Sequence, residues 1–223
     1  MKRMLILLAA VILAASCREA APAKLDAASL GSHLRTGDLV FVGIPASYSL
    51  EEDGMDSAIA ASTGKGALNL IHVAIAEAAR DSVWIIDATI RHGVDRHPLD
   101  TFLRDFTLKD GSSPVFLVKR LREKGLAAAG VERAKTFVGQ PYDVAFLPDN
   151  GALYCTELVR ESFLGPKGEY LFPNRPMNFK NAQGEFPLYW QQLFALIGQE
   201  IPQDLPGTNP QDMFTSPLLK AVK

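Results

Sequence analysis

Four short apolar segments, separated by turn residues, favour a fold built around a β-sheet. They cover residues 39–44, 70–76, 82–89 and 115–119. Each has the length of an ordinary strand. Gly37-Asp38 forms a turn signal just before the first segment. Arg80-Asp81 leaves only a tight connection between the second and third, which predicts a β-hairpin.

Helical patterns alternate with and follow these segments. Leu99, Phe102, Leu103 and Phe106 repeat at the spacing of one helix face. Helices are predicted over residues 51–61, 98–106, 127–138, 153–163 and 187–197. Residues 165–186 are rich in Gly, Pro and Asn and predict an irregular surface excursion, and the chain after Ile201 predicts an extended tail. The chain of 223 residues therefore predicts one α+β domain, an antiparallel sheet packed against helices.

The first residues predict export rather than structure. Lys2 and Arg3 precede an apolar run too short to span a membrane, so residues 1–16 read as a signal peptide. Leu13-Ala14-Ala15-Ser16-Cys17 resembles a bacterial lipobox, which predicts lipid attachment at Cys17 and anchoring to a bacterial membrane at the cell envelope. The alternative is ordinary cleavage nearby, with Cys17 incidental. Residues 17–33 then predict a flexible tether, and residues 34–223 the catalytic domain.

Charge and residue spacing argue against several kinds of partner. The formal net charge is -2 and no basic patch stands out, so nucleic acid is not an expected partner. The four histidines are scattered, and no His/Cys pair has zinc-ligand spacing. No phosphate-binding Gly-rich motif is present. The sequence therefore predicts neither a metal nor a cofactor.

Cys155 is the residue most in need of an explanation. The chain has two cysteines, and a lipid on Cys17 would leave Cys155 without a partner in an oxidising compartment. A buried, inert thiol is one explanation. However, the loop Asp149-Asn150-Gly151 precedes Cys155 and an apolar helical pattern follows it. A helix N-terminus favours a thiolate and can stabilise the oxyanion of an acyl-transfer intermediate.

His72 and Asp87 are polar residues within apolar strands. A lone histidine in a strand is often a satisfied core residue, but a thiolate nucleophile needs a basic partner held by a third polar group. If the two strands pair in a register where partner numbers sum to roughly 158 to 160, His72 and Asp87 face each other. His33 is expected to face solvent, and His92 and His97 read as loop residues.

Several segments together resemble the permuted papain-like amidohydrolases, the YiiX-like branch related to NlpC-type cell-wall peptidases. They are Gly37-Asp38-Leu39-Val40-Phe41, His72-Val73-Ala74-Ile75, Asp87-Ala88, Gly139-Gln140-Pro141-Tyr142-Asp143 and Tyr154-Cys155-Thr156-Glu157-Leu158-Val159. The histidine precedes the cysteine, as in the permuted members. The third catalytic residue in this branch is often glutamate, and Asp87 stands there in this chain.

The resemblance implies a circularly permuted papain-like fold and a thiol hydrolase. It assigns Cys155 as nucleophile, His72 as its base and Asp87 as the group that orients the imidazole. Tyr142, Tyr154 and Glu157 are expected to contribute to substrate binding. The alternative for Glu157 is an acid favourably placed at a helix N-terminus. The expected substrate is an amide in a cell-wall or related small peptide. The alternatives are an acyl-lipid amide or ester, as in lecithin:retinol acyltransferase relatives, and a non-catalytic binding lipoprotein.

Overall fold

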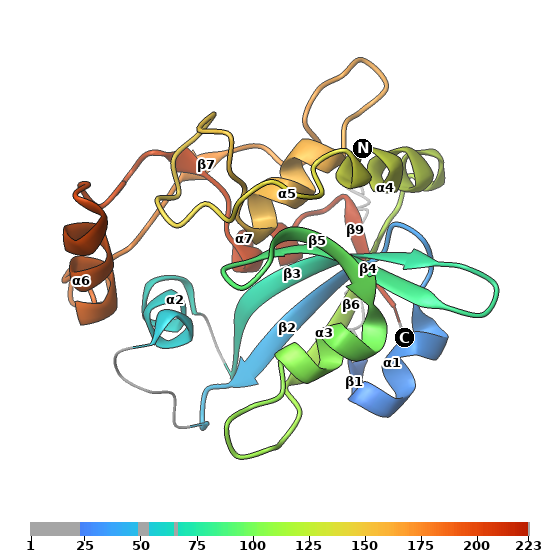
Figure 1. Cartoon of the computed structure of the whole chain (residues 1–223), viewed down its shortest axis with the longest axis horizontal. Coiled ribbons are helices and arrows are strands. Elements are labelled where there is room, and N and C mark those ends of the chain that lie inside the picture. The colour runs from blue at the N-terminus through green and yellow to red at the C-terminus, as the bar shows by residue number, and fades with distance from the viewer. Residues whose placement is uncertain (1–22, 49–53, 65–66, 223) are drawn as a thin grey trace, which may run out of the picture.

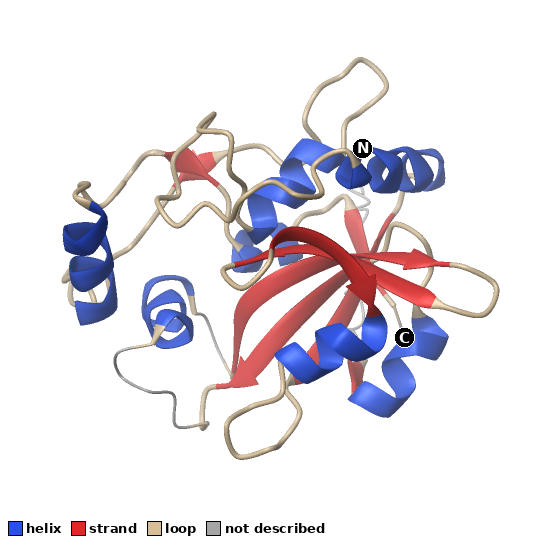
Figure 2. Ribbon diagram, in the orientation of Figure 1, coloured by secondary structure: helices blue, strands red, loops and turns tan. Residues whose placement is uncertain are grey.

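The computed structural model describes residues 23–48, 54–64 and 67–222. The predicted signal peptide and Cys17 lie outside these residues and stay predictions. None of the helices in the described part of the chain is long and apolar enough to span a bilayer. The fold is of the α+β class, with one large antiparallel sheet and helices on both of its faces (Figures 1 and 2).

The sheet follows the order β1-β6-β2-β3-β4-β5, and β9 also pairs with β6. Its strands are β1 (Lys24–Leu25), β2 (Leu39–Pro45), β3 (Leu68–Ala78), β4 (Val83–Thr89), β5 (Gly93–Pro98), β6 (Val115–Leu121) and β9 (Leu219–Ala221). All four predicted strands are confirmed. Every pairing in this sheet is antiparallel.

The helices are α1 (Ala27–His33), α2 (Met55–Thr63), α3 (Leu99–Asp105), α4 (Ala127–Lys135), α5 (Cys155–Ser162), α6 (Leu188–Ile197) and α7 (Pro210–Phe214), with a 3-10 turn at Lys124–Leu126. The five predicted helices are present with shifted ends. The first begins at Met55, and its predicted start at residue 51 lies outside the described residues. Residues 165–186 are irregular apart from β7 (Arg175–Pro176), which pairs with β8 (Pro206–Gly207).

Both faces of the sheet are covered by apolar packing. One core cluster contains Phe41, Val73 and Ile75 from the sheet together with Leu158 and Val159 of α5. The cluster on the opposite face joins other sheet residues to Leu30 of α1 and Phe102 of α3. Because successive side chains of a strand point to opposite faces, strands buried on both sides read as continuous apolar runs.

The β3–β4 hairpin forms as predicted, but its register differs from the expected one. Ile75 pairs with Ile86, and Ala76 pairs with Ile85. One further step of this register sets Ala74, not His72, opposite Asp87. A shift of two residues keeps a side chain on the same face. His72 and Asp87 are therefore diagonal neighbours on one face, beyond the last pair that the hairpin forms.

Part of the range predicted as a tether is folded structure. Residues 24–33 form β1 and α1, and Leu25 and Leu30 are buried. The predicted boundary at residue 34 falls inside this folded part. The predicted extended tail also needs correction, because it contains α7 and ends in β9. Pro210 at the first position and the Asn209 cap allow α7 to begin there.

Candidate active site

Cys155 is the first residue of α5, and the chain enters that helix through a tight turn. Asp149 and Gly151 have positive φ angles of 56° and 79°. The Asn150 side chain accepts a hydrogen bond from the backbone N–H of Ala152. Asp, Asn and Gly tolerate such backbone geometry better than other residues do. The turn therefore places the thiol at the helix N-terminus, as the sequence predicts.

The first turn of α5 presents backbone donors beside the sulfur. Tyr154 is the N-cap residue, and no side chain caps the helix. The first intrahelical bond runs from the N–H of Leu158 to the carbonyl of Tyr154. The N–H groups before Leu158 precede this ladder and carry the positive end of the helix dipole. Cys155 is a free thiol and is 7% exposed.

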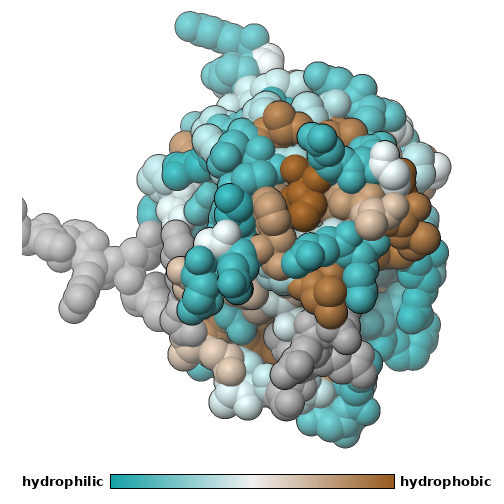
Figure 3. Space-filling view, turned by 90° about the vertical axis from the view of Figure 1, so that its left-hand side faces the viewer, coloured by the Kyte–Doolittle hydropathy of each residue, from teal (hydrophilic) through white to brown (hydrophobic). Residues whose placement is uncertain are grey.

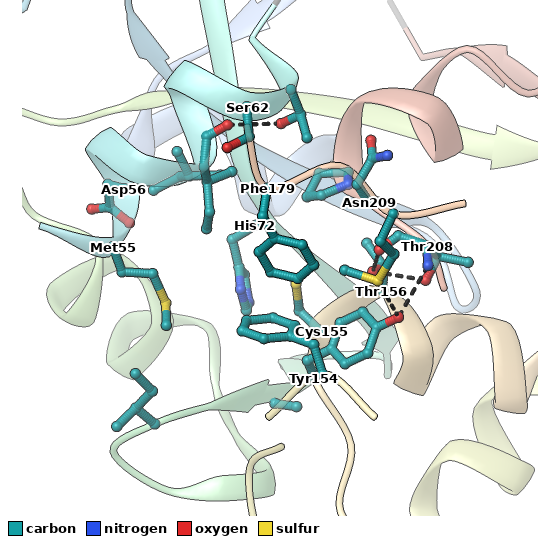
Figure 4. A pocket seen from close by; sticks show the side chains of 18 of the residues that line it. Met55, Asp56, Ser62, His72, Tyr154, Cys155, Thr156, Phe179, Thr208 and Asn209 are labelled. Atoms are coloured by element: carbon teal, nitrogen blue, oxygen red, sulfur yellow. Dashed lines mark hydrogen bonds between the residues drawn. The ribbon is translucent and has the colours of Figure 1, made fainter. Parts of the chain in front are cut away.

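His72 and Asp87 make a buried hydrogen bond. The distance from His72 Nε2 to Asp87 Oδ2 is 2.8 Å, and both residues are buried. Because an ionised carboxylate only accepts hydrogen bonds, Nε2 carries the proton and Nδ1 is left for another partner. Figure 4 shows the imidazole of His72 and the sulfur of Cys155 facing each other. The three residues predicted as catalytic thus lie together.

A second histidine, His97 of β5, completes this arrangement. Its Nε2 lies 2.9 Å from Asp87 Oδ1, so each carboxylate oxygen accepts from one imidazole. His97 pairs with Ile85, two residues from Asp87 along β4. His72, Asp87 and His97 therefore form a diagonal row across three strands. The interpretation of His97 as a loop residue was wrong, because residues 93–98 form an edge strand.

The electrostatic setting favours charged forms of His72 and Asp87. Burial by itself lowers the pKa of His72, but the interactions with Cys155 and Asp87 outweigh it and raise the pKa from 6.5 to about 10. Burial likewise opposes ionisation of Asp87, but hydrogen bonds from His72 and His97 lower its pKa to about 2. The pKa of His97 is raised by Asp87 despite burial. At neutral pH the imidazole of His72 is thus an imidazolium.

Aromatic packing holds the imidazole in place from α3 and the segment after it. The ring of Phe106 lies 4.6 Å from the ring of His72, and Phe102 lies farther away at 6.3 Å. Phe102 also packs against His97, at 6.5 Å between ring centroids. These contacts restrict rotation of both histidines, so the hydrogen-bonded row is fixed by packing as well as by Asp87.

A cavity of about 290 Å³ opens beside Cys155 and His72. Its walls come from α2, β3, β4, the start of α5, the segment at residues 177–179, Trp190 of α6 and the segment at residues 208–210. Figure 4 shows Met55 and Asp56 on α2, on the opposite side of the cavity from Thr208 and Asn209. The thiol is therefore reachable from a pocket of the size that small ligands occupy.

Two of the three residues expected to bind substrate line this cavity. Tyr142 and Tyr154 are among its lining residues. The hydroxyl of Tyr154 accepts a hydrogen bond from the backbone N–H of Thr208 at 3.0 Å. The pKa of each tyrosine is raised, chiefly by burial. Both hydroxyls are therefore neutral at physiological pH, and that of Tyr154 donates to the sulfur of Met177 at 3.6 Å.

Glu157, the third of these residues, is not among the side chains that line the cavity. It is 9% exposed, in the first turn of α5, and its Oε2 atom has no hydrogen-bond partner. Burial, reinforced by Asp143 and Glu161, raises the pKa of Glu157 to about 8. The backbone N–H of Tyr154 acts in the opposite direction. This placement matches an acid at the N3 position of a helix.

The other histidines lie outside this row. His92 interacts with Asp105 at 3.2 Å near the surface, and His33 contacts the carbonyl of Ser29 at 2.9 Å. Among the described residues, no group of three or more His, Cys, Asp or Glu side chains is arranged to hold a metal ion.

Comparison with known proteins identifies the family of the chain and a solved structure with a similar fold. A family model described as permuted papain-like amidase enzyme, YaeF/YiiX, matches residues 33–223. The crystal structure of YiiX from Escherichia coli O157:H7, described as a metalloprotein, aligns with a TM-score of 0.65 and 21% sequence identity. The alignment covers 86% of this chain and 97% of the other. No curated protein matches the chain significantly.

Proposed function

The chain belongs to the YaeF/YiiX family of permuted papain-like amidases, and from this premise we propose that it cleaves an amide bond with Cys155, His72 and Asp87. One observation carries the proposal. The thiol at the start of α5 and the imidazole bonded to Asp87 share one cavity. A nucleophile, a base and a group that orients the base are the parts that thiol acyl transfer requires.

The first half of the reaction forms an acyl-enzyme. The Cys155 thiolate attacks the carbonyl carbon, and the new S–C bond pushes an electron pair onto the carbonyl oxygen. The backbone N–H groups at the start of α5 stabilise that negative charge. The electron pair then returns and the C–N bond breaks. The leaving nitrogen takes the proton from Nδ1 of His72, so an amine departs and the imidazole becomes neutral.

The second half releases the acid. Neutral His72 accepts a proton from water as the water oxygen attacks the thioester carbonyl. The C–O bond forms, the S–C bond breaks, and the sulfur leaves as a thiolate beside the restored imidazolium. Asp87 stays ionised throughout, because two histidines hydrogen-bond to it and lower its pKa to about 2. Its part is to fix the ring so that Nδ1 faces the sulfur.

The described side chains do not fit a resident metal ion, although the Escherichia coli protein is described as a metalloprotein. Both carboxylate oxygens of Asp87 already accept from imidazoles, at 2.8 and 2.9 Å. The Nδ1 atom of His97 faces the carbonyl of Pro98 at 3.3 Å. The proposed steps therefore use protein groups and water alone.

The pH dependence of Cys155 alkylation by iodoacetamide tests the proposal. On soluble protein that starts after Cys17, we expect rapid alkylation at pH 6, because imidazolium at His72 stabilises the thiolate. His72→Ala should slow alkylation at pH 6 by at least tenfold and leave the rate at pH 10 nearly unchanged. Cys155→Ser, which removes the nucleophile, provides the matched control for labelling elsewhere.

Two results would count against catalysis. Alkylation of the native protein that becomes fast only in alkaline solution and ignores His72 would indicate an ordinary buried thiol. Reactive Cys155 without turnover of any amide would favour the binding lipoprotein that the sequence leaves open. In either case the fold would remain and the hydrolase proposal would fail.

A further inference from the structure

Glu157 is a buried acid in the first turn of α5, two residues beyond the nucleophile. Figure 3 shows the side of the molecule that carries α2 and α6, where hydrophobic side chains lie among hydrophilic ones. The catalytic cavity takes walls from both of these helices, but Glu157 is not among the described residues that line it. Its residue is 9% exposed, and its Oε2 atom has no hydrogen-bond partner among the described residues. A buried polar atom without a partner calls for an explanation.

The groups around Glu157 disfavour its ionised form. Burial is the main cause that raises the pKa of Glu157 to about 8, and the acids Asp143 and Glu161 add to it. Two groups act in the opposite direction, the backbone N–H of Tyr154 and the guanidinium of Arg160. That guanidinium is already bonded to Glu161. A neutral carboxylic acid at Glu157 therefore removes a like charge from a group of neighbouring acids.

Asp143 is held in place as one of these neighbours. Its carboxylate accepts hydrogen bonds from the backbone N–H groups of Ala145 at 2.9 Å and Leu147 at 2.8 Å. The backbone N–H of Asp143 bonds to the carbonyl of Leu153 at 3.3 Å, which ties its loop to the turn before the nucleophile. Glu157 thus has a fixed acidic neighbour on this loop as well as one on its own helix.

The first turn of α5 has one end that attracts anions, and two groups can use it. Its free backbone N–H groups are those that the proposed reaction assigns to the thiolate and the oxyanion. An ionised acid at the N3 position interacts with the same N–H groups and the same helix dipole. A neutral acid carries no charge that competes with the sulfur. The protonation state of Glu157 therefore decides how much of the positive end of α5 serves the reaction.

We propose that Glu157 is a positioning residue that acts through the first turn of α5. As a neutral acid it leaves the N–H groups of that turn to the Cys155 sulfur and the oxyanion, and as a carboxylate it competes for them. The inference rests on the proposed function, because it concerns the anions that form during that reaction. The reaction then has an alkaline limit at about pH 8, below the limit at about pH 10 that loss of the His72 proton sets.

Carbon-13 NMR of the glutamate Cδ carbons measures the protonation state of Glu157 directly. Glu157→Gln removes one resonance and thereby assigns it. We expect this resonance to keep the chemical shift of a neutral carboxyl at pH 7 and to titrate at more alkaline pH. A resonance that titrates in the acid range ordinary for a glutamate would overturn the proposal.

Acetaldehyde tests the link to the nucleophile without requiring turnover. The Cys155 thiolate adds to its carbonyl carbon, the carbonyl oxygen takes the electron pair, and the imidazolium of His72 remains as the counter-ion. The adduct places this oxygen where the oxyanion of a substrate forms, and protection of Cys155 against iodoacetamide gives its dissociation constant. From pH 7 to pH 9 the native protein should lose about tenfold more affinity than Glu157→Gln, because about nine-tenths of Glu157 is ionised at pH 9.

Two further variants separate this effect from a general change of charge. Glu161→Gln removes an acid that neighbours Glu157 and releases Arg160 from its bond, so the loss of acetaldehyde affinity should begin at a lower pH. Glu200→Gln makes the same exchange at an exposed residue after α6 and should keep the native pH profile. Circular dichroism confirms that the variants are folded.

The outcomes separate this inference from the hydrolase proposal. Equal pH profiles for the native protein and Glu157→Gln would overturn the inference and leave the hydrolase intact. An acetaldehyde affinity that follows the ionisation of Glu157, without turnover of any acyl p-nitroanilide by Cys155, would support the inference and contradict the hydrolase. A Glu161→Gln profile equal to the native one would overturn the role given to the neighbouring acids.

Discussion

Asp87 gains its role from two hydrogen bonds, and only one of its donors is expected of a catalytic triad. His72 bonds to one oxygen and His97 to the other. A carboxylate held at both oxygens cannot rotate, so the direction in which it fixes His72 is set partly by His97. His97 is not among the residues that line the cavity, and we expect it to act as a positioning residue through Asp87.

Replacing His97 tests this role at a single residue. His97→Phe removes the donor to Oδ1, which loosens Asp87 and raises its pKa. We expect Cys155 alkylation at pH 6 to slow by about ten- to a hundredfold, the cost of a lost bond to a charged group. The fall of the rate on the acid side should also begin at a higher pH.

His97→Gln serves as the matched control, because its amide can still donate to Asp87. His97→Gln should recover most of the rate of Cys155 alkylation. Its rate should again fall at nearly the same acid pH as that of the native protein. If the two variants behave alike, or if His97→Phe keeps the native pH profile, His97 contributes packing alone.

The candidate residues differ in how visible they are in the sequence. His72 and Asp87 stand out because each interrupts an apolar strand, and Cys155 because it follows a Gly-containing turn. His97 lies in Gly93-Val94-Asp95-Arg96-His97-Pro98, which is polar and ends in proline. An edge strand tolerates such a sequence, because only one of its sides must pair. The segment joins the sheet as β5 by pairing with β4, and no local sequence pattern reveals this pairing.

The start of α5 is held by an element far away in the chain. Thr156 Oγ1 donates to the carbonyl of Thr208 at 3.1 Å, and Thr208 Oγ1 donates to Thr156 Oγ1 at 2.9 Å. Thr156 is fully buried and Thr208 nearly so. Because α5 lacks a side-chain cap, these bonds with the segment after β8 fix the turn that carries the nucleophile.

Thr208→Val tests this link between elements. The variant keeps the side-chain shape but loses the hydroxyl, which leaves the buried Thr156 hydroxyl without a donor. We expect a loss of about 1–2 kcal/mol in the free energy of unfolding by urea. Alkylation of Cys155 should also slow, since the helix start becomes less fixed. Thr208→Ser retains the hydroxyl and should stay close to the native protein in both measurements. A stability equal to that of the native protein for Thr208→Val would show that the bonds contribute nothing net.

Strand and helix positions followed from local patterns, but hairpin register did not. A short connection limits the register of two strands without fixing it, and both faces of β3 and β4 are apolar, so no alternation of polar residues selects one pairing. The predicted contact between His72 and Asp87 is still made, because the observed register differs from the predicted one by two residues. A shift of two residues leaves both side chains on the same face of the sheet. The side chains reach each other diagonally rather than directly across.

The molecule as a whole includes more of the N-terminal segment than its composition indicates. Arg120 of β6 bonds to both oxygens of buried Asp38 at 2.6 Å and to the carbonyl of His33 at 3.3 Å. Asp26 caps α1 by accepting from the N–H of Ser29 at 2.8 Å. A two-residue strand and a seven-residue helix are too short for periodicity to reveal, so the sequence predicts a tether here.

Shortening the chain measures what this segment contributes to the whole domain. A protein that starts at residue 34 lacks β1 and α1, which exposes the sheet surface that Leu25 and Leu30 cover. Full burial of two leucines stabilises a fold by roughly 3–6 kcal/mol, so its urea midpoint should fall well below that of a protein starting at residue 23. Both proteins retain Cys155, His72 and Asp87, so Cys155 should still be alkylated in the absence of urea. Equal midpoints would mean that residues 23–33 behave as the tether their composition suggests; a lower midpoint with intact reactivity would place the start of the folded domain near residue 23.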